Sequence, residues 1–461
     1  MFMMKRSLVL LALLVSVLVA RAAPPTVEGF TYVKTLGGID EYTLNSNGLQ
    51  VLLMPEHSAP VVTFMVTYHV GSRNEVTGTT GATHLLEHLM FKGSVNFNKE
   101  KGTKFDQILD PIGAGNNATT WLDRTNYYET FGNEHLPLIV ELEADRMRNL
   151  LLREDDRRPE MTVVRNEFER GENSPFSALI KEISQAAYVA HPYHHNTIGW
   201  RSDIEKVSIE KLREFYDTFY WPDNATVTVV GDFSPVDALA LIRKSYGVIP
   251  HAPKPIPQIY TEEPEQSGPR RVVVKRAGQL GVVALGHKTP AATHPDFPAV
   301  VILSAILGDG KNSRLYKTIT DQSLSTGVSI FPFPTRDPSL HFTFIPLAPG
   351  ATHEAVEKIA FAQIEKLKTD GVTDAEVQAA LAKALGDSAY QRDGTFAIAS
   401  NINTYIAVGD WTLYHNFDES LKKVTPADVQ RVAQKYFNVD QSTTGWFIPL
   451  APAAPKAPAK K

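Results

Sequence analysis

The chain has 461 residues and a formal net charge of −5 at neutral pH, with 46 basic residues against 51 acidic ones. This acidic balance argues against nucleic acid as a partner, because phosphate backbones are bound by an excess of Lys and Arg. The chain contains no cysteine, so it can have neither disulfides nor thiolate metal ligands, and a metal site would have to use His and carboxylates.

The first 22 residues have the composition of a secretory signal peptide. Lys5 and Arg6 form a positive segment, residues 7–19 are apolar, and residues 20–22 are an A-x-A cleavage site. The apolar segment is too short for a membrane span, and no other stretch is apolar enough; the alternative is an uncleaved anchor. We expect a secreted, periplasmic protein without a membrane span after cleavage. About 440 residues remain, more than one core usually holds, so two or more domains are expected.

Strand-forming residues dominate the segment before the first motif. Residues 51–54 are a short apolar run ended by Pro55, and residues 61–70 are rich in Val, Thr, Phe and Tyr. A turn follows at 71–75, and then a short segment at 78–81 that begins and ends with glycine. We therefore expect strands that deliver the chain to the helix described next.

Residues 83–91 contain no Pro or Gly and favour a helix. His84, Glu87 and His88 are three and four residues apart, so they share one face of that helix. Two imidazoles at this spacing can hold one Zn²⁺, and the Glu between them would be placed to take a proton from a water that the metal acidifies. H-x-x-E-H is the inverzincin order. The alternative is a helix with two incidental histidines.

A turn rich in Gly and Asn at 113–120 leads into residues 121–131, which have the composition of a strand. One interpretation is a surface hairpin. The other is an edge strand that pairs with an extended substrate. Composition alone favours neither.

Two helices are expected next, over residues 136–152 and from about residue 158. Pro159 suits the start of the second helix. Its apolar side is predicted from residues that recur at helical spacing: Met161, Val164 and Phe168.

A catalytic zinc site with two His ligands needs a third, and without Cys a Glu is the natural candidate. Glu160 and Glu167 are seven residues apart and share a face of the second helix. Glu169 is a further candidate. Spacing alone cannot choose among the three.

An internal repeat is the best indication of domain organisation. Residues 204–227 and 421–444 align without a gap at an offset of 217 residues, and each reads as a Ser- or Thr-capped amphipathic helix, a polar turn and a strand. Self-similarity at half the chain length predicts two related α+β domains.

Composition also predicts the domain limits. The segment 251–270 is rich in proline and reads as an extended linker, and the Ala/Pro/Lys tail 451–461 as disordered. These limits leave an N-terminal, zinc-binding peptidase domain at 23–250 and a homologous C-terminal domain at 271–450.

With these motifs in order, the chain resembles the insulinase-like (pitrilysin) zinc metallopeptidases, which include the mitochondrial processing peptidase. The matching stretches span most of the chain in family order. They are VGSRNE at 70–75, HLLEHLMFKG at 84–93, NATT at 117–120 with Asp123, VVRNE at 163–167, HPY at 191–193, IGW at 198–200 and SRLY at 313–316.

The resemblance implies a ligand set that spacing could not choose. It implies Glu167 as the third zinc ligand with His84 and His88. It implies Glu87 as general base and Glu160 as a carboxylate behind the ligands that orients the site.

The resemblance also implies a fold and a way of binding substrate. The fold is α+β, with two homologous domains that are each a mostly antiparallel sheet packed with helices. Asn117, Ala118 and Thr119 would lie on an edge strand that takes the peptide substrate as an added strand. In the family, two such two-domain units close like a clamshell around peptide, which implies a dimer.

One departure from the family pattern concerns the second half. Catalytic members commonly carry an Arg and a Tyr, seven residues apart, shortly after the S-R-L motif. Here those positions are Thr320 and Gly327. We expect a zinc-less homologous chain to supply the Arg and the Tyr, since each copy in a homodimer would lack both residues. The alternative is an enzyme that does without them.

These observations predict a zinc-dependent metalloendopeptidase that hydrolyses small or unfolded polypeptides through metal-activated water. The alternatives are a non-catalytic structural subunit and a peptide-binding protein.

Overall fold

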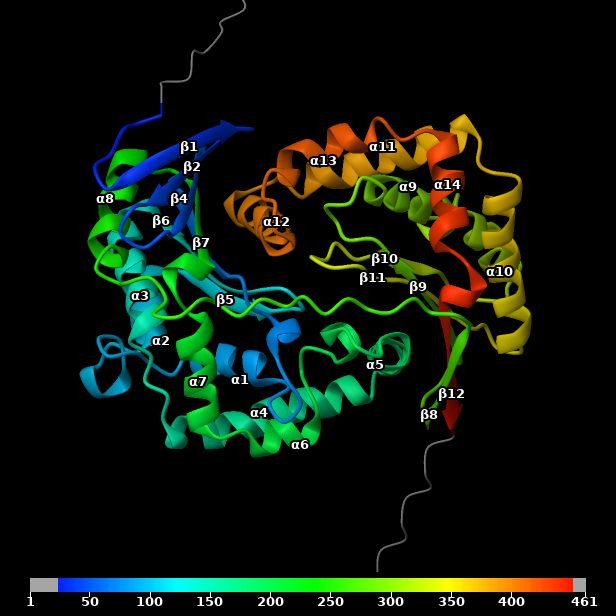
Figure 1. The fold of residues 1–461 in the computed structure, drawn as a ribbon, viewed down its shortest axis with the longest axis horizontal. Coiled ribbons are helices and arrows are strands. Elements are labelled where there is room, and N and C mark those ends of the chain that lie inside the picture. Colours follow the sequence, from blue (N-terminus) through cyan, green and yellow to red (C-terminus); the bar gives the residue numbers. More distant parts are fainter. Residues whose placement is uncertain (1–23, 451–461) are drawn as a thin grey trace, which may run out of the picture.

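The computed structural model describes residues 24–450 (Figure 1). The signal peptide expected at 1–22 and the tail expected at 451–461 lie outside the described residues. Two β-sheets organise the rest, and each is accompanied by its own set of helices (Figure 1). The two halves lie side by side, one built before residue 250 and the other after residue 270.

The first sheet has seven strands in the order β1-β2-β3-β7-β4-β6-β5. β7 runs parallel to β3, and every other pairing is antiparallel. The strands are β1 (Phe30–Leu36), β2 (Ile39–Leu44), β3 (Gln50–Pro55), β4 (Val61–Tyr68), β5 (Gly115–Thr120), β6 (Thr125–Gly132) and β7 (Ala225–Gly231).

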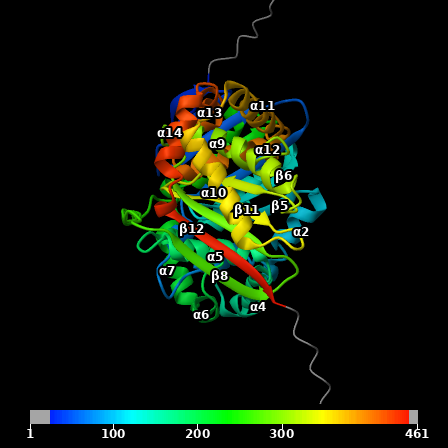
Figure 2. The same ribbon diagram turned by 90° about the vertical axis from the view of Figure 1, so that its right-hand side faces the viewer.

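The second sheet has five strands in the order β10-β11-β9-β12-β8. β12 runs parallel to β8 and antiparallel to β9, and Figure 2 shows β8 and β12 side by side. The strands are β8 (Arg270–Ala277), β9 (Val282–Thr289), β10 (Ser329–Pro332), β11 (Ser339–Pro346) and β12 (Ser442–Leu450). This order and these directions repeat those of β5, β6, β4, β7 and β3, which confirms the predicted α+β fold with two mostly antiparallel sheets.

Helices flank both sheets. In the first half they are α1 (Ala82–Leu89), α2 (Phe105–Leu109), α3 (Leu136–Arg148), α4 (Glu154–Glu172), α5 (Pro175–Ala187), α6 (Arg201–Lys206), α7 (Ile209–Phe219) and α8 (Pro235–Tyr246). In the second half they are α9 (Phe297–Gly308), α10 (His353–Thr369), α11 (Asp374–Tyr390), α12 (Thr395–Val408), α13 (Leu413–Leu421) and α14 (Pro426–Tyr436).

Two expected helix limits were wrong. The helix expected over 136–152 ends at Arg148, because Leu150 leaves it to pair with Ser94 in an isolated antiparallel bridge. The next helix begins at Glu154, so Pro159 lies inside it. Its first turn is acidic, which stabilises the positive end of the helix dipole, and this signal places the start ahead of the proline.

The internal repeat is visible in the structure. α7 and α14 begin and end 217 residues apart, and so do the first residues of β7 and β12. The predicted caps are present too, because Ser208 and Thr425 accept hydrogen bonds from the backbone N–H of Lys211 and Asp428 at 3.3 and 3.2 Å.

Each half contributes a helix to the other half's sheet. Leu179 and Ile183 of α5 pack with the core of the second sheet. Gly286 and Gly445 on that sheet permit this approach, since a Cβ at either would lie 2.8 Å from Ile183. In return, Ile402 of α12 packs with residues of the first sheet. The exchange ties the halves together through two apolar interfaces.

The linker was predicted at 251–270. Residues 251–269 contain neither helix nor strand and cross the molecule in an extended form (Figure 1), and β8 begins at Arg270. Glu263 anchors it by accepting hydrogen bonds from the backbone N–H groups of Val189, Ala190 and His191. Within residues 24–450, no helix is long and apolar enough to cross a membrane.

Candidate metal centre

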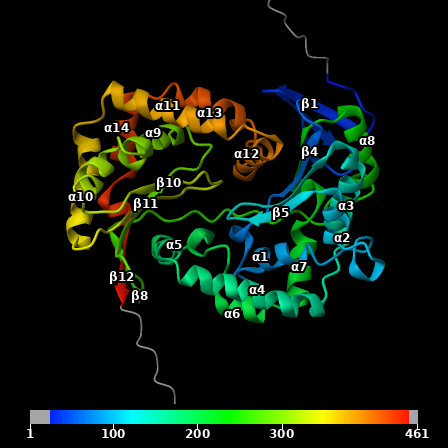
Figure 3. The same cartoon turned by 180° about the vertical axis from the view of Figure 1, so that it is seen from behind.

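Helix α1 lies beneath the edge strand β5 and is held at its first turn by a buried carboxylate (Figure 3). Glu75 accepts hydrogen bonds from the backbone N–H groups of Gly81 and Thr83, each at 2.8 Å, in place of a side-chain cap. Burial raises the pKa of Glu75 to about 8. Gly81 has φ +82°, and Gly199 packs so closely that a Cβ there would lie 2.4 Å from the Gly81 nitrogen. This packing sets where the helix begins.

The apolar side of α1 sets which way its functional side turns. Leu85, Leu86 and Leu89 are buried in the core of the first half. His84 and His88 consequently project from the opposite side, with ring centroids 4.8 Å apart.

The two histidines converge on Glu167 of α4. Its Oε2 lies 3.6 Å from Nε2 of His84 and 3.5 Å from Nε2 of His88. One potential ligand atom from each residue lies within 4.8 Å of the others, and this is the only such group of three among the described residues. Donors bound at 2.0–2.2 Å to one tetrahedral ion are about 3.4 Å apart, so the spacing suits zinc.

The surroundings of the two histidine rings also suit a cation. Burial lowers the pKa of His84 to about 3, so its ring is neutral. Nδ1 of His88 lies 2.8 Å from Oε1 of Glu160, and a proton on Nδ1 leaves the Nε2 lone pair facing Glu167. Two imidazole nitrogens and a carboxylate oxygen therefore meet at one point, where a cation is the complementary group.

Glu160 and Lys92 support His88 from behind. Burial alone would lower the pKa of His88, but the bond to Glu160 and the charge of Glu167 raise it above its usual value. Burial alone would raise the pKa of Glu160, but its bonds to His88 and Lys92 hold it lower. Lys92, which the sequence did not single out, thus keeps Glu160 charged and able to orient the imidazole.

Glu87 lies on the same face of α1 and is held by the edge strand. The hydroxyl of Thr120, the last residue of β5, donates a hydrogen bond to Oε2 of Glu87. Burial raises the pKa of Glu87. Thr120 lay within a motif but had been given no role, and only the fold shows that β5 ends directly over α1.

Asn117, Ala118 and Thr119 lie on β5, which pairs only with β6 and is an edge of the first sheet. Asn117 and Thr119 are exposed, whereas Ala118 is buried. Arg124 fixes the end of the strand by donating to the backbone oxygen of Thr119 at 3.0 Å. The strand thus offers an edge without a further strand beside the histidines, and on it the N–H of Ala118 donates to Oδ1 of Asn117 at 2.9 Å.

The remaining candidates lie elsewhere. Glu169 is exposed on α4 and faces Arg201 at 3.7 Å, away from the His84–His88–Glu167 group. His191 joins a polar cluster that fastens the second half to the first. In that cluster Arg73 pairs with both Asp123 and Asp337, and Nε2 of His191 lies 3.1 Å from Asp337. Three of the sequence motifs thus serve to join the halves.

A cavity of about 300 Å³ borders the Glu167 side of the group. Phe168, Ser177, Ile180 and Thr197 contribute to its wall. A side chain of a peptide bound near the histidines would have room there.

Comparison with known proteins identifies the family. The description "Insulinase (Peptidase family M16)" matches residues 50–200, and "Peptidase M16 inactive domain" matches residues 206–384. The zinc protease PqqE of Helicobacter pylori is 35% identical over 408 residues, which cover 87% of this chain and 91% of that protein. The chain belongs to peptidase family M16. The resemblance inferred from the motifs is confirmed.

Solved structures extend the similarity over most of the described chain. A crystal structure of a protease from Helicobacter pylori has 34% sequence identity and a TM-score of 0.84, and the match covers 90% of this M16 chain and 100% of that one. The periplasmic protease PqqL from Escherichia coli, 16% identical, has a TM-score of 0.73 and matches over 91% of this chain and 48% of that one. The second likeness shows the fold alone.

Replacing Glu160 by Gln is expected to weaken zinc binding about 10- to 100-fold, the usual effect of removing a charged partner behind a metal-bound histidine. The amide oxygen can still accept from His88, but the negative charge is gone. Competition with a chromophoric chelator measures the affinity. Glu169→Gln, an exposed change on the same helix, is the control. Equal affinities for the two variants would contradict the role of Glu160.

Proposed function

We propose that this M16 chain is a zinc-dependent metalloendopeptidase that cleaves small or unfolded polypeptides. The observation that carries the proposal is the convergence of His84, His88 and Glu167 directly beside an open strand edge. His84, His88 and Glu167 would hold the ion. When bound, zinc supplies a Lewis acid that acidifies water and polarises a peptide carbonyl.

Glu87 would move the proton in this reaction. Its Oε2 is engaged by Thr120, so Oε1 is the atom available to accept a proton from the attacking water. The same oxygen would then deliver the proton to the leaving amine. The raised pKa of Glu87 supports this role, because a carboxyl group with a pKa nearer neutrality both accepts and releases a proton readily.

The substrate would bind as an added strand on β5, with the backbone of residues 117–119 as its partner. Such pairing reads backbone rather than side chains and requires an extended peptide, which favours unfolded or small polypeptides. The 300 Å³ cavity beside Glu167 would take one substrate side chain.

A dimer with a zinc-less homologous chain completes the proposal. The hydroxyl of Thr320 lies 2.7 Å from that of Ser325, and Gly327 has no side chain, so neither residue offers a cation or a phenol. The absence of this Arg/Tyr pair also favours the second candidate function, a non-catalytic structural or peptide-binding subunit.

We further propose that the protein is exported to the periplasm. We propose domain limits at 23–250 and 271–450, with a linker at 251–270.

Zinc content and peptide cleavage test the proposal. The purified chain is expected to bind one zinc per chain and to cleave a quenched fluorescent peptide in a way that a chelator abolishes and added zinc restores. Zinc binding without cleavage, followed by cleavage on mixing with a zinc-less homologue, supports the dimer. Cleavage that survives complete chelation would contradict the zinc mechanism, and zinc binding that no partner converts into cleavage would favour the non-catalytic function.

A further inference from the structure

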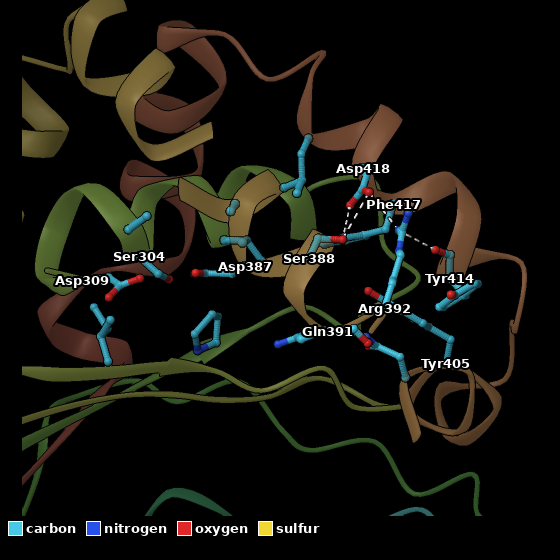
Figure 4. A pocket seen from close by; sticks show the side chains of 17 residues that line it. Ser304, Asp309, Asp387, Ser388, Gln391, Arg392, Tyr405, Tyr414, Phe417 and Asp418 are labelled. Atoms are coloured by element: carbon cyan, nitrogen blue, oxygen red, sulfur yellow. Dashed lines mark hydrogen bonds and ion pairs between the residues drawn. The ribbon is translucent and has the colours of Figure 1, made fainter. Parts of the chain in front are cut away.

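A second cavity, of about 220 Å³, lies in the other half of the molecule (Figure 4). α9, α11, α12, α13 and β10 all contribute residues to its wall. It lies outside the metal centre described above, and no step of the proposed reaction uses it.

The internal repeat relates this cavity to the metal centre. A row of paired residues crosses the first sheet from Ala225 through β4 and β6 to Thr120, the residue that holds Glu87. The matching row in the second sheet starts at Ser442, 217 residues after Ala225, and reaches Pro332. Pro332 lines the cavity. The cavity thus lies under β10 in the second half, in the position that the metal centre occupies under β5 in the first half.

The helices agree with the strands. The three cavity-lining residues of α9 lie 217 positions after His84, Glu87 and His88, and Ala384 of α11 lies 217 positions after Glu167. Every metal donor is therefore replaced in the second half. The α9 residues are Val301, Ser304 and Ala305. The repeat has kept the hollow but not the donors, and among the described residues no group of three metal-binding side chains forms here.

The charges of the wall favour a cationic occupant. Asp309 and Asp387 share a single ammonium, since Nζ of Lys383 lies 3.0 Å from one carboxylate and 2.7 Å from the other. Asp418 is paired with Arg392 at 2.8 Å. Asp309 and Asp387, which are both exposed to solvent, thus carry one negative charge more than Lys383 neutralises.

The opposite end of the cavity is aromatic. Tyr405, Tyr414 and Phe417 line it, and the guanidinium of Arg392 already lies 5.1 Å from the centre of the Tyr414 ring (Figure 4). Aromatic faces attract cations and also cover an aliphatic chain. Excess carboxylate at one end and rings at the other are complementary to an ammonium group on an aliphatic stem.

We propose that this cavity binds a primary alkylammonium group, with Asp309 and Asp387 as its anionic partners and the aromatic wall against its stem. Two sources carry this chemistry: a free amine and the lysine side chain of a peptide. The free amine needs no catalytic activity. The peptide source rests on the proposed peptidase function.

Binding of n-butylammonium to the full chain tests the free amine, with n-butanol as the neutral probe of similar size. Ligand-observed NMR, with zinc present and after chelation, is expected to show binding of the ammonium and not of the alcohol. Asp309→Asn together with Asp387→Asn is expected to weaken binding about tenfold or more, roughly the loss of one ion pair. Asp370→Asn, an exposed change in the same half, should have no effect.

Filling the cavity provides a second test. Ala384→Phe places a ring in the hollow and is expected to abolish ammonium binding, whereas Ala382→Phe on the exposed face of the same helix is the matched control. Equal binding of alcohol and ammonium, no binding of either, or unchanged affinity in the Asp309/Asp387 double variant would overturn the proposal.

Two peptides that differ only in Lys against norleucine distinguish the sources. Their affinities are compared on a Glu87→Gln background to prevent cleavage. Tighter binding of the Lys peptide, lost in Ala384→Phe, assigns the cavity to substrate. Equal peptide affinities with intact n-butylammonium binding assign it to a free amine. Because n-butylammonium binding is measured without turnover, failure of the peptidase proposal would leave this result standing.

Discussion

Glu87→Gln is expected to leave zinc bound and to lower turnover by roughly 10²- to 10⁴-fold, the contribution of a well-placed general base. The three proposed ligands His84, His88 and Glu167 are untouched, and the amide oxygen can still accept from Thr120. The lost property is the ability of Oε1 to take up a proton. Steady-state cleavage of a fluorescent peptide and zinc content of the same preparation measure the two effects.

The control for this experiment is Glu169→Gln, which removes an exposed carboxylate near the site without touching it. It should retain zinc and full turnover. Undiminished cleavage in Glu87→Gln would exclude Glu87 as the base. Loss of zinc in Glu87→Gln would instead mean that Glu87 supports the ligands.

Arg146→Met is expected to destabilise the fold by about 3–5 kcal/mol, because it leaves buried carboxylates without their cation. Arg146 of α3 is completely buried, with Glu143 against its guanidinium and Oε1 of Glu129 at 3.3 Å. The rings of Phe91 and Tyr127 lie over the same guanidinium, with their centres 5.2 and 4.4 Å away. Urea denaturation of the purified chain measures the loss.

The pH dependence of this variant has a definite sign. Burial, followed by repulsion from Glu143, raises the pKa of Glu129 well above its usual value, while the charge of Arg146 lowers it, so removing Arg146 raises this pKa further. A carboxyl group with a raised pKa in the folded state stabilises below its unfolded pKa and loses that contribution as pH rises. The loss of unfolding free energy caused by Arg146→Met should therefore be smaller near pH 5 than at pH 8.

Two further variants complete that experiment. Arg158→Met removes an exposed cation and should cost less than about 1 kcal/mol. Adding Glu129→Gln and Glu143→Gln to Arg146→Met removes the stranded charges and should recover much of the loss. A deficit that is independent of pH and unchanged by these additions would show that packing, not charge, dominates at Arg146.

Much of the candidate site could be predicted because its spacing is a local property of the helix. His84, Glu87 and His88 share a face in any α-helix, and the leucines between them decide which side is buried. The 217-residue repeat likewise predicted two related α+β units, since the same pattern of caps, apolar positions and strand residues produces the same elements twice. Composition also predicted an extended linker at 251–270, and residues 251–269 contain neither helix nor strand.

The position of the proposed third ligand depends on contacts between distant parts of the chain. Helical spacing left Glu160, Glu167 and Glu169 open, and a family resemblance was needed to choose among them. The packing of α4 against α1 brings Glu167 to both histidines, puts Glu160 behind His88 and turns Glu169 to solvent. Spacing along one helix fixes relative directions, but not what each side chain meets.

The sequence by itself therefore determined most of the elements, their repetition and the shared face of His84, Glu87 and His88, because these follow from periodicity and capping within short segments. Only the tertiary structure decided which helix covers which sheet, where β5 ends above Glu87, and that a hollow related to the metal centre persists in the second half. Those features arise from side chains that are far apart in sequence and come into contact only when both sheets are packed.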